Sequence, residues 1–306
     1  MKEFPKGCCT EPVRYFKIPT GTLHLSIAEY NVSQDLWHEK IIKDTLEDHE
    51  GTVSCGGRTN ANLCDADDIV GLAGKEELAT LVECLDKAST AYGMEISAEK
   101  TKLMTNNTSG INTEIKVNEQ KLETVTSFKY LRSIITDDGS KSDIHSRTAQ
   151  TTAAWTRLKP VWNDRSIFPS SQIRLMRSLV TSIFLYACES WTLTVELQRK
   201  MEAMETRCYR KILCISYNQF TNEEVRVKIQ QAIGPHEELL TTVKRHKLQW
   251  YGHVSHSSDL TKTVLQGKVT GGRRQGRQRK RWEDNIREWT GLEFAKSKRA
   301  VENREK

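Results

Sequence analysis

The feature that most constrains the fold of this chain is a pair of adjacent carboxylates, Asp67 and Asp68, set between two short apolar runs. Residues 63–70 read LCDADDIV, which predicts two short β-strands joined by a tight turn. Such strands draw the turn towards the interior, where unpaired charge is costly. A divalent cation offsets that cost, because Mg²⁺ prefers hard oxygen ligands and leaves coordination positions open for phosphates. The pair therefore predicts a metal site for phosphoryl transfer, and the alternative is a solvated acidic turn.

Two further motifs follow the pair. Residues 93–102 read GMEISAEKTK, and residues 127–136 read SFKYLRSIIT. With the Ala-Asp-Asp run that ends at Asp68, they resemble the palm of reverse transcriptases of non-LTR (LINE, RTE-like) retrotransposons, in which K-T-K and F-K-Y-L-G-S-I-I motifs follow in this order. The likeness extends over about residues 36–300, beyond the palm. The later motifs are FLYACESWTL at 184–193, RCYRKIL at 207–213, KLQWYGHV at 247–254 and GRQRKRW at 276–282.

This resemblance identifies the chain as a C-terminal fragment of such a reverse transcriptase and implies an α+β fold. Residues 36–140 would form a partial polymerase palm, which is an antiparallel sheet with a supporting helix. Residues 141–220 would form an all-α thumb, and residues 221–306 a basic helical C-terminal region. Residues 1–35 show no clear periodicity and resemble no part of the family, so they stay unplaced.

Apolar periodicity in the first half fits a sheet with a helix behind it. Apolar residues recur at helical spacing between Gly74 and Gly93, which predicts an amphipathic helix there. Short strands are expected around Ile96 and over residues 111–117 and 125–135.

The pattern is helical from Ser142 onwards, with broad apolar faces at helical spacing. Thr221 predicts a helix start and Gly234 its end. The other expected helices span residues 36–48, 237–250 and 282–289. Three tryptophans are expected in the core of the helical part, although any that are exposed could stack on bases. The three are Trp155, Trp162 and Trp191.

The resemblance also implies roles for individual residues. Asp67 corresponds to the catalytic, metal-binding aspartate of the family, and Asp68 to its neighbour, so that both are expected to hold Mg²⁺. Lys100 stands where the family has a lysine that assists pyrophosphate departure, and the alternative is a solvated lysine at a strand end. The hairpin expected to press the primer end towards the active site is formed by Tyr130, Leu131 and Arg132.

The chain departs from the family pattern at several positions. The partner carboxylate of the family lies on a strand well upstream, and none of Asp35, Asp44 and Asp48 has an apolar strand-like setting. The fingers region and a glutamine-rich motif are also missing. Asp65 replaces an aromatic residue, and Arg132 replaces a glycine, where a side chain would be strained if φ is positive. We therefore expect a chain that cannot polymerise DNA on its own.

The net charge of +6 is unevenly spread, because a basic segment lies near the C-terminus. It predicts contacts with the phosphates of RNA and DNA, and the alternative is a solvated charged loop. Tyr251 and Trp282 could add base stacking. A second hypothesis is therefore a non-catalytic nucleic-acid-binding module, and a third is a translated relic that folds poorly. The basic segment includes Arg273, Arg274, Arg277, Arg279, Lys280 and Arg281.

Composition limits the classes of protein to which the chain can belong. Hydrophobic residues at 37% and charged residues at 28% are typical of a soluble protein, and no apolar run approaches the roughly 20 residues of a membrane helix. The start lacks the apolar core of a signal peptide, so the chain is expected in the cytosol or nucleus, with its eight cysteines reduced. Cys208 and Cys214 belong to no C-x-x-C pair, which argues against a zinc site. No small-molecule substrate beyond nucleotides is expected.

Overall fold

The computed structural model of the chain describes the following residues: 21–28, 54–55, 58–59, 62–65, 68–73, 75–105, 115–117, 119–136, 139–256, 262, 265, 280–293 and 296–297. Side chains are described from Leu78 onwards within these ranges, apart from Thr105. The chain divides into two compact units. The sheet unit comprises Met1–Asp137 and His256–Arg277, and the helical unit Asp138–Ser255 and Gln278–Lys306. The predicted α+β class is confirmed, whereas the assignment of these parts as palm and thumb stays a prediction.

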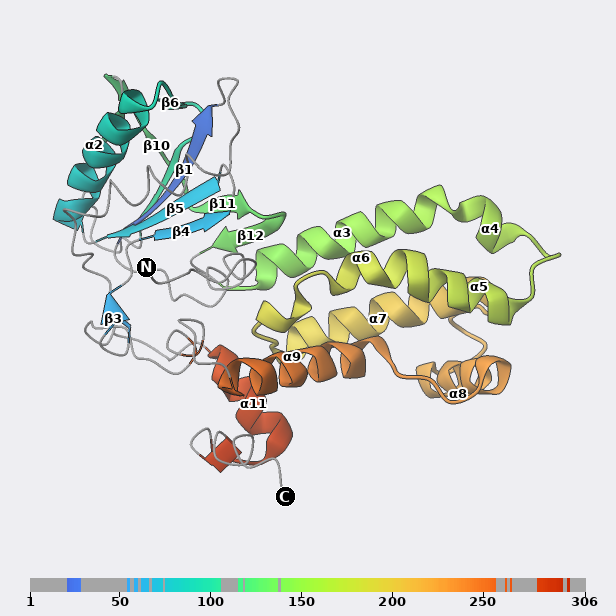
Figure 1. Ribbon diagram of the computed structural model, residues 1–306. Helices are drawn as coiled ribbons and strands as arrows, with labels where there is room; N and C mark the ends of the chain where they lie inside the picture. Colours follow the sequence, from blue (N-terminus) through green and yellow to red (C-terminus); the bar gives the residue numbers. More distant parts are fainter. Residues whose placement is uncertain are drawn as a thin grey trace. The chain divides into compact units, whose positions relative to one another are not determined.

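The sheet unit is built around one central strand, β1 (Gly21–Ala28), visible in blue in Figure 1. The strand order is β10-β7-β1-β5-β4, and β6 also pairs with β1. Neighbouring strands are antiparallel, except for β10 and β7, which run parallel. The other strands of this sheet are β4 (Asn62–Asp65), β5 (Asp68–Ala73), β6 (Glu95–Ile96), β7 (Lys102–Thr105) and β10 (Glu123–Thr124).

The position of β1 is a finding that the sequence analysis missed, since residues 1–35 were left unplaced. Residues 21–28 read GTLHLSIA, with Leu23, Leu25 and Ile27 alternating with polar residues. This period-2 alternation is the signal of a strand, but it covers a single short run without a second motif beside it. Its pairing partners are distant in sequence, and only the tertiary fold shows them.

One helix, α2 (Lys75–Ala91), supports this sheet, as the apolar periodicity predicted. It turns its apolar stripe towards strand residues and forms a core in which Leu78 and Val82 are each 1% exposed. Gly93, with φ of 71°, ends the helical stretch as expected. Three two-stranded ladders complete the described part of the unit: β2 (Ser54–Cys55) with β3 (Arg58–Thr59), β8 (Lys116–Val117) with β9 (Gln120–Lys121), and β11 (Ser127–Tyr130) with β12 (Ser133–Thr136).

The helical unit consists of packed helices, as predicted. Its bounds are α3 (Lys141–Arg157), α4 (Lys159–Asn163), α5 (Pro169–Leu175), a π-helical turn (Met176–Thr181), α6 (Ser182–Leu185), a 3₁₀ turn (Cys188–Ser190), α7 (Val195–Ile212), α8 (Asn222–Ile233), α9 (Leu239–His256) and α11 (Trp282–Thr290). Thr221 and Glu224 form a capping box that starts α8, and Gly234 ends this helix. The helix expected to end at Trp250 continues to His256. Among the described helices, none is long and apolar enough to cross a bilayer.

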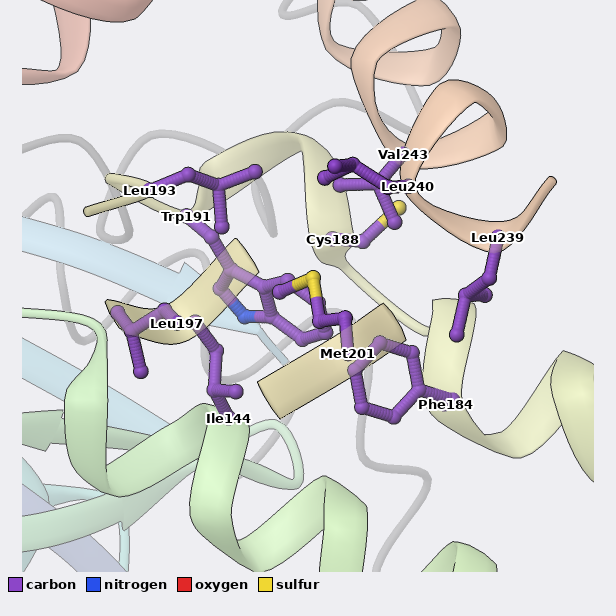
Figure 2. Close-up of a cluster of buried hydrophobic side chains, with 10 residues drawn as sticks. All are labelled: Ile144, Phe184, Cys188, Trp191, Leu193, Leu197, Met201, Leu239, Leu240 and Val243. Carbon is purple, nitrogen blue, oxygen red and sulfur yellow. The ribbon is translucent and has the colours of Figure 1, made fainter. Parts of the chain in front are cut away.

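Large aromatic side chains fill the cores of the helical unit. Phe184 and Trp191 meet edge to face with their ring centroids 5.2 Å apart (Figure 2). Trp155 stacks on Trp162 at 4.5 Å in a second cluster. Trp162 and Trp191 are buried and Trp155 is half-buried, so the prediction that these tryptophans belong to the core is confirmed.

Ala187 adopts a strained backbone conformation between α6 and the 3₁₀ turn, with φ of 60°. Replacing it with glycine removes the clash of Cβ in the left-handed region, so Ala187→Gly should raise the free energy of unfolding by about 0.5–1 kcal/mol. Urea denaturation of the full chain measures this change. Ala203→Gly is the control, because it lies on the exposed face of α7 and should lower stability by about 1 kcal/mol. A loss of stability in Ala187→Gly would contradict the strain.

Candidate functional site

The two strands predicted on either side of the acidic pair are present as β4 and β5, which are antiparallel. Asp65 of β4 stands opposite Asp68 of β5, and Leu63 stands opposite Val70. Asp68 is the first residue of β5. Asp67 lies outside the described residues, as does the side chain of Asp68, so their role as Mg²⁺ ligands stays a prediction.

Strand β1 brings the acidic hairpin and the predicted catalytic lysine to the same end of the sheet. On one side of β1, Ser26 stands opposite Asp68. On the other side, Ile27 stands opposite Ile96 and His24 opposite Lys102. Lys100 lies in the connection from β6 to β7, two residues before Lys102, and β7 lies on the opposite side of β1 from β5. The pairing of β1 with β5, β6 and β7 therefore links the position of Asp68 to the turn that carries Lys100.

The surroundings of Lys100 are consistent with both interpretations of this residue. Lys100 is exposed, and its backbone N–H donates a hydrogen bond to Ser97 Oγ at 3.4 Å. The Thr101 hydroxyl donates to the Ser97 carbonyl at 2.7 Å, which fixes the turn. A lysine on such a turn could meet a phosphate at the sheet end, or it could remain solvated.

The strand beside the acidic hairpin carries no carboxylate within residues 21–28. Near the position that pairs with Asp68, the sequence of β1 has Ser26 and His24, neither of which is acidic. Residues that stand opposite each other on antiparallel strands share a face, so position 26 shares a face with Asp65 and Asp68. This face therefore has acidic residues on β4 and β5 and a serine on β1.

Residues with described side chains do not form another metal site, because they include no cluster of three or more His, Cys, Asp or Glu suited to a metal ion. Burial raises the pKa of Cys188 and of Cys208 to about 12. Thiols of this kind stay protonated at neutral pH and are poor metal ligands.

The predicted primer hairpin is present as β11 and β12, with Tyr130 opposite Ser133. Leu131 and Arg132 form its two-residue turn, with φ of 45° and 63°, as in a type I′ turn. The φ of Arg132 is positive, which is the condition under which the sequence analysis expects strain at this position. Tyr130 is 0% exposed, whereas Arg132 points into solvent, so Tyr130 supports the hairpin from its buried side. Contact with a primer stays a prediction.

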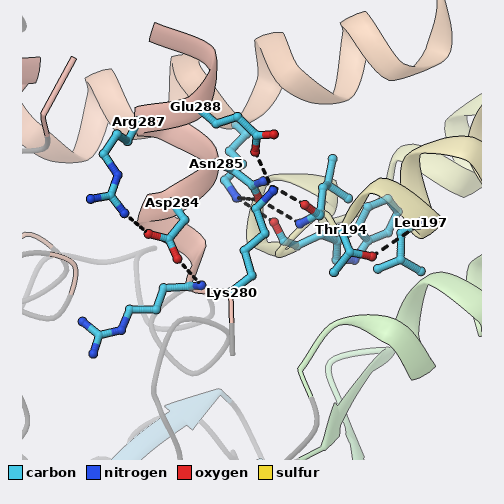
Figure 3. A network of polar contacts seen from close by, with 11 residues as sticks. Thr194, Leu197, Lys280, Asp284, Asn285, Arg287 and Glu288 are labelled. Atoms are coloured by element: carbon cyan, nitrogen blue, oxygen red, sulfur yellow. Dashed lines mark hydrogen bonds and ion pairs between the residues drawn. The ribbon is translucent and has the colours of Figure 1, made fainter. Parts of the chain in front are cut away.

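The last two residues of the basic segment, Lys280 and Arg281, form ion pairs with α11. Lys280 Nζ lies 2.5 Å from Glu288 Oε2 (Figure 3). Arg281 Nη1 lies 3.3 Å from Glu283 Oε1. The bond from Lys280 lowers the pKa of the Glu288 carboxyl. Both cations are therefore engaged by acidic groups of α11. The remaining predicted phosphate contacts lie outside the described residues: Arg273, Arg274, Arg277 and Arg279.

A buried lysine, which the sequence analysis missed, organises the C-terminal part of the helical unit. Lys247 is 0% exposed, and its Nζ donates to the Trp191 carbonyl at 2.7 Å and to Asn285 Oδ1 at 3.1 Å. The ring of Trp282 lies 4.4 Å from the same nitrogen. Burial lowers the pKa of Lys247 well below its usual value, and the charge of Lys280 lowers it further.

Asn285 completes this polar centre by pairing with backbone atoms. Its Oδ1 accepts from the Leu193 N–H at 2.7 Å, and its Nδ2 donates to the Leu193 carbonyl at 2.9 Å. Figure 3 shows Asn285 reaching from α11 towards the segment before Thr194. An asparagine and a lysine on otherwise apolar helix faces were the signal in the sequence, because such positions are filled by polar residues only when these are paired.

The polar centre explains three of the motifs that follow the palm region. Residues 184–193 provide Trp191, residues 247–254 begin with Lys247, and residues 276–282 end with Trp282, whose Nε1 donates to the Glu189 carbonyl at 2.8 Å. Tyr251 is 2% exposed, so the prediction that it stacks on bases is wrong. Trp282 is half-buried and covers the lysine, which gives it a structural role.

The lowered pKa of Lys247 predicts a pH dependence of stability. An unfolded lysine takes up its proton below about pH 10.4, and folded Lys247 only at a lower pH. Between these values the unfolded state binds more protons, so stability should rise with pH by up to about 1.4 kcal/mol per unit. Lys247→Met should remove this rise of stability with pH. Urea denaturation of both proteins at a series of pH values measures the difference. Lys211→Met, at an exposed position, is the control. Parallel curves for the wild type and Lys247→Met would show that the buried amine stays charged.

The left-handed conformation of Arg132 predicts that glycine is more stable than alanine at this position. Arg132→Gly and Arg132→Ala both remove the side chain beyond Cβ, but only alanine keeps the steric clash. We expect Arg132→Gly to exceed Arg132→Ala by about 1 kcal/mol in free energy of unfolding. Urea denaturation of the two variants measures this difference in free energy of unfolding. Equal stability would mean that the turn relaxes around alanine.

The chain was compared with protein-family models and with known proteins. No protein-family model matches the chain. A transposon-derived protein of Caenorhabditis elegans, itself uncharacterised, is 28% identical to the chain over 242 residues, which are 76% of this chain and 85% of that protein. This similarity fits a transposon origin for the chain.

Proposed function

We propose that this chain derives from the reverse transcriptase of a non-LTR retrotransposon, and that it binds RNA and DNA but does not polymerise DNA on its own. The origin is supported by the order of the palm-like motifs and by the similarity to a transposon-derived protein. The loss of polymerase activity is supported by one observation above all: β1, which pairs with β5 up to Asp68, carries Ser26 where a third carboxylate could stand.

The reasoning follows from two-metal chemistry. Two Mg²⁺ ions stabilise the attacking and the leaving oxygen of nucleotidyl transfer, and they need carboxylates from neighbouring strands to stay in place. Asp67 and Asp68 are adjacent in sequence, and β1 adds only a hydroxyl and an imidazole at that end. Uncharged groups of this kind are weak Mg²⁺ ligands, since the ion favours charged oxygen. Any Mg²⁺ bound by the pair is therefore expected to bind weakly.

Primer extension on an RNA template with Mg²⁺ tests polymerase activity directly. We expect the purified chain to incorporate no more nucleotide than Asp67→Ala. Incorporation that disappears in Asp67→Ala would overturn the proposed loss of activity.

An added carboxylate on β1 tests the proposed reason for the loss of polymerase activity. Ser26→Asp places a third carboxylate on the face shared by Asp65 and Asp68, so we expect its Mn²⁺ affinity to rise by about tenfold in calorimetric titration. Thr22→Asp is the matched control, because position 22 shares this face but stands opposite Leu72 at the other end of β5. An equal gain in both variants would show non-specific attraction of the cation.

A non-catalytic nucleic-acid-binding module is the second candidate, favoured by the cluster of cations in residues 273–281. Neutralising Arg273, Arg274, Arg277 and Arg279 together should weaken RNA binding and reduce the slope of affinity against salt by about three to four. The matched control neutralises exposed cations of the sheet unit instead: Lys87, Lys116, Lys121 and Lys129. Binding without salt dependence would contradict a phosphate contact.

A further inference from the structure

The two loops at one end of the helical unit form a joined surface, which we call the bundle end. One loop, residues 164–168, links α4 to α5, and the other, residues 213–221, links α7 to α8 (Figure 1). Arg165 Nη1 of the first loop donates a hydrogen bond to Cys214 Sγ of the second at 2.8 Å. The two loops are therefore fixed beside each other.

Each loop of the bundle end exposes one large aromatic ring. Phe168 is 76% exposed and Tyr217 is 66% exposed, which makes them the most exposed large apolar side chains of the described residues. Rings that lie this far out of the core contribute little to folding. Two of them on adjacent loops mark a surface that meets a ligand.

A buried arginine, Arg210, fixes the loop that carries Tyr217 by hydrogen bonds to its backbone. Arg210 is 4% exposed, and its guanidinium donates to the Ser216 carbonyl at 3.0 Å and to the Phe220 carbonyl at 2.7 Å. The same guanidinium lies 4.9 Å from the centre of the Tyr217 ring. One side of the ring is thus supported by a fixed cation, and the exposed side is presented to solvent in a set orientation.

Cations outnumber carboxylates in the stretches of chain that carry these rings. Within residues 157–174 and 207–220 several cations are exposed and the only carboxylate is Asp164, while the exposed Glu223 and Glu224 follow in the first turn of α8, where Glu224 caps the helix and Glu223 pairs with Arg226. Asp164 already accepts hydrogen bonds from the N–H and the hydroxyl of Ser166, at 2.9 and 2.7 Å. The exposed cations are Arg157, Lys159, Arg165, Arg174, Arg207 and Lys211.

We propose that the bundle end binds unpaired bases of single-stranded nucleic acid, with Tyr217 and Phe168 stacking on bases while Arg165 and Lys211 contact the phosphates. Exposed rings among cations match this ligand, because every base has a π face and every nucleotide adds a negative charge. An apolar segment of a partner protein would gain nothing from so many cations. The proposal rests on the proposed function only in taking nucleic acid as the partner, since it uses neither the acidic hairpin nor the basic segment.

Fluorescence anisotropy with labelled oligothymidylate of about 12 nucleotides tests this site, at about 50 mM salt. Tyr217→Ser and Phe168→Ser should each weaken binding by about tenfold, whereas Tyr217→Trp should keep it. An abasic strand of equal length should bind less tightly and should not respond to Tyr217→Ser. Val227→Ser is the control, because Val227 is 52% exposed on α8 and lies outside both loops.

Three outcomes would overturn the inference. One is unchanged affinity in both serine variants, and another is an abasic strand that binds as tightly as the oligothymidylate. The third is a dimer of the wild type that Phe168→Ser converts to a monomer in light scattering, because the occupant would then be a second copy of this chain.

The same assay separates this inference from the proposed function. If binding is lost in the variant with Arg273, Arg274, Arg277 and Arg279 neutralised, yet unaffected by Tyr217→Ser, nucleic-acid binding stands and the bundle end fails. If binding survives that variant and is lost in Tyr217→Ser, the bundle end stands and the role of the basic segment fails.

Discussion

The helical unit depends on the burial of one amine. Lys247 lies in the interior with its hydrogen bonds directed to the Trp191 carbonyl and to Asn285, and with Trp282 over its nitrogen. A buried amine is costly unless each partner is in place, so the unit is stable only when α9, α11 and the segment before α7 meet in one arrangement. This requirement links residues that are far apart in the chain and makes the polar centre a determinant of the fold.

The sheet unit is organised by a comparable constraint, the central position of β1. This strand pairs with β5 on one side and with β6 and β7 on the other, so it sets which residues meet at the sheet end. It aligns Asp68 with Ser26 and places the Lys100 turn on the opposite side. The register thus relates the positions of two predicted catalytic residues, Asp68 and Lys100, and the residue opposite Asp68 is an uncharged serine.

Two kinds of nucleic-acid contact are proposed for these units. The acidic hairpin belongs to the proposed polymerase ancestry, and its partner strand β1 carries no carboxylate within residues 21–28. The bundle end and the basic segment rely on cations and exposed rings, which need neither a metal ion nor a closed active site. A chain of transposon origin could therefore keep an affinity for nucleic acid after its catalytic geometry was lost, because the two properties depend on different residues.

The sequence alone determined α2, the strands beside the acidic pair and most helices, because these follow from local periodicity and from caps such as Thr221. The α+β class was implied by the resemblance of its motifs to a known family. It also indicated the strained turn at Arg132. Only the tertiary structure decided that residues 21–28 lie at the centre of the sheet, that Lys247 is buried and that Tyr251 faces inwards. The physical reason is that strand partners and the pairing of buried polar groups depend on contacts between residues far apart in sequence, which local patterns do not encode.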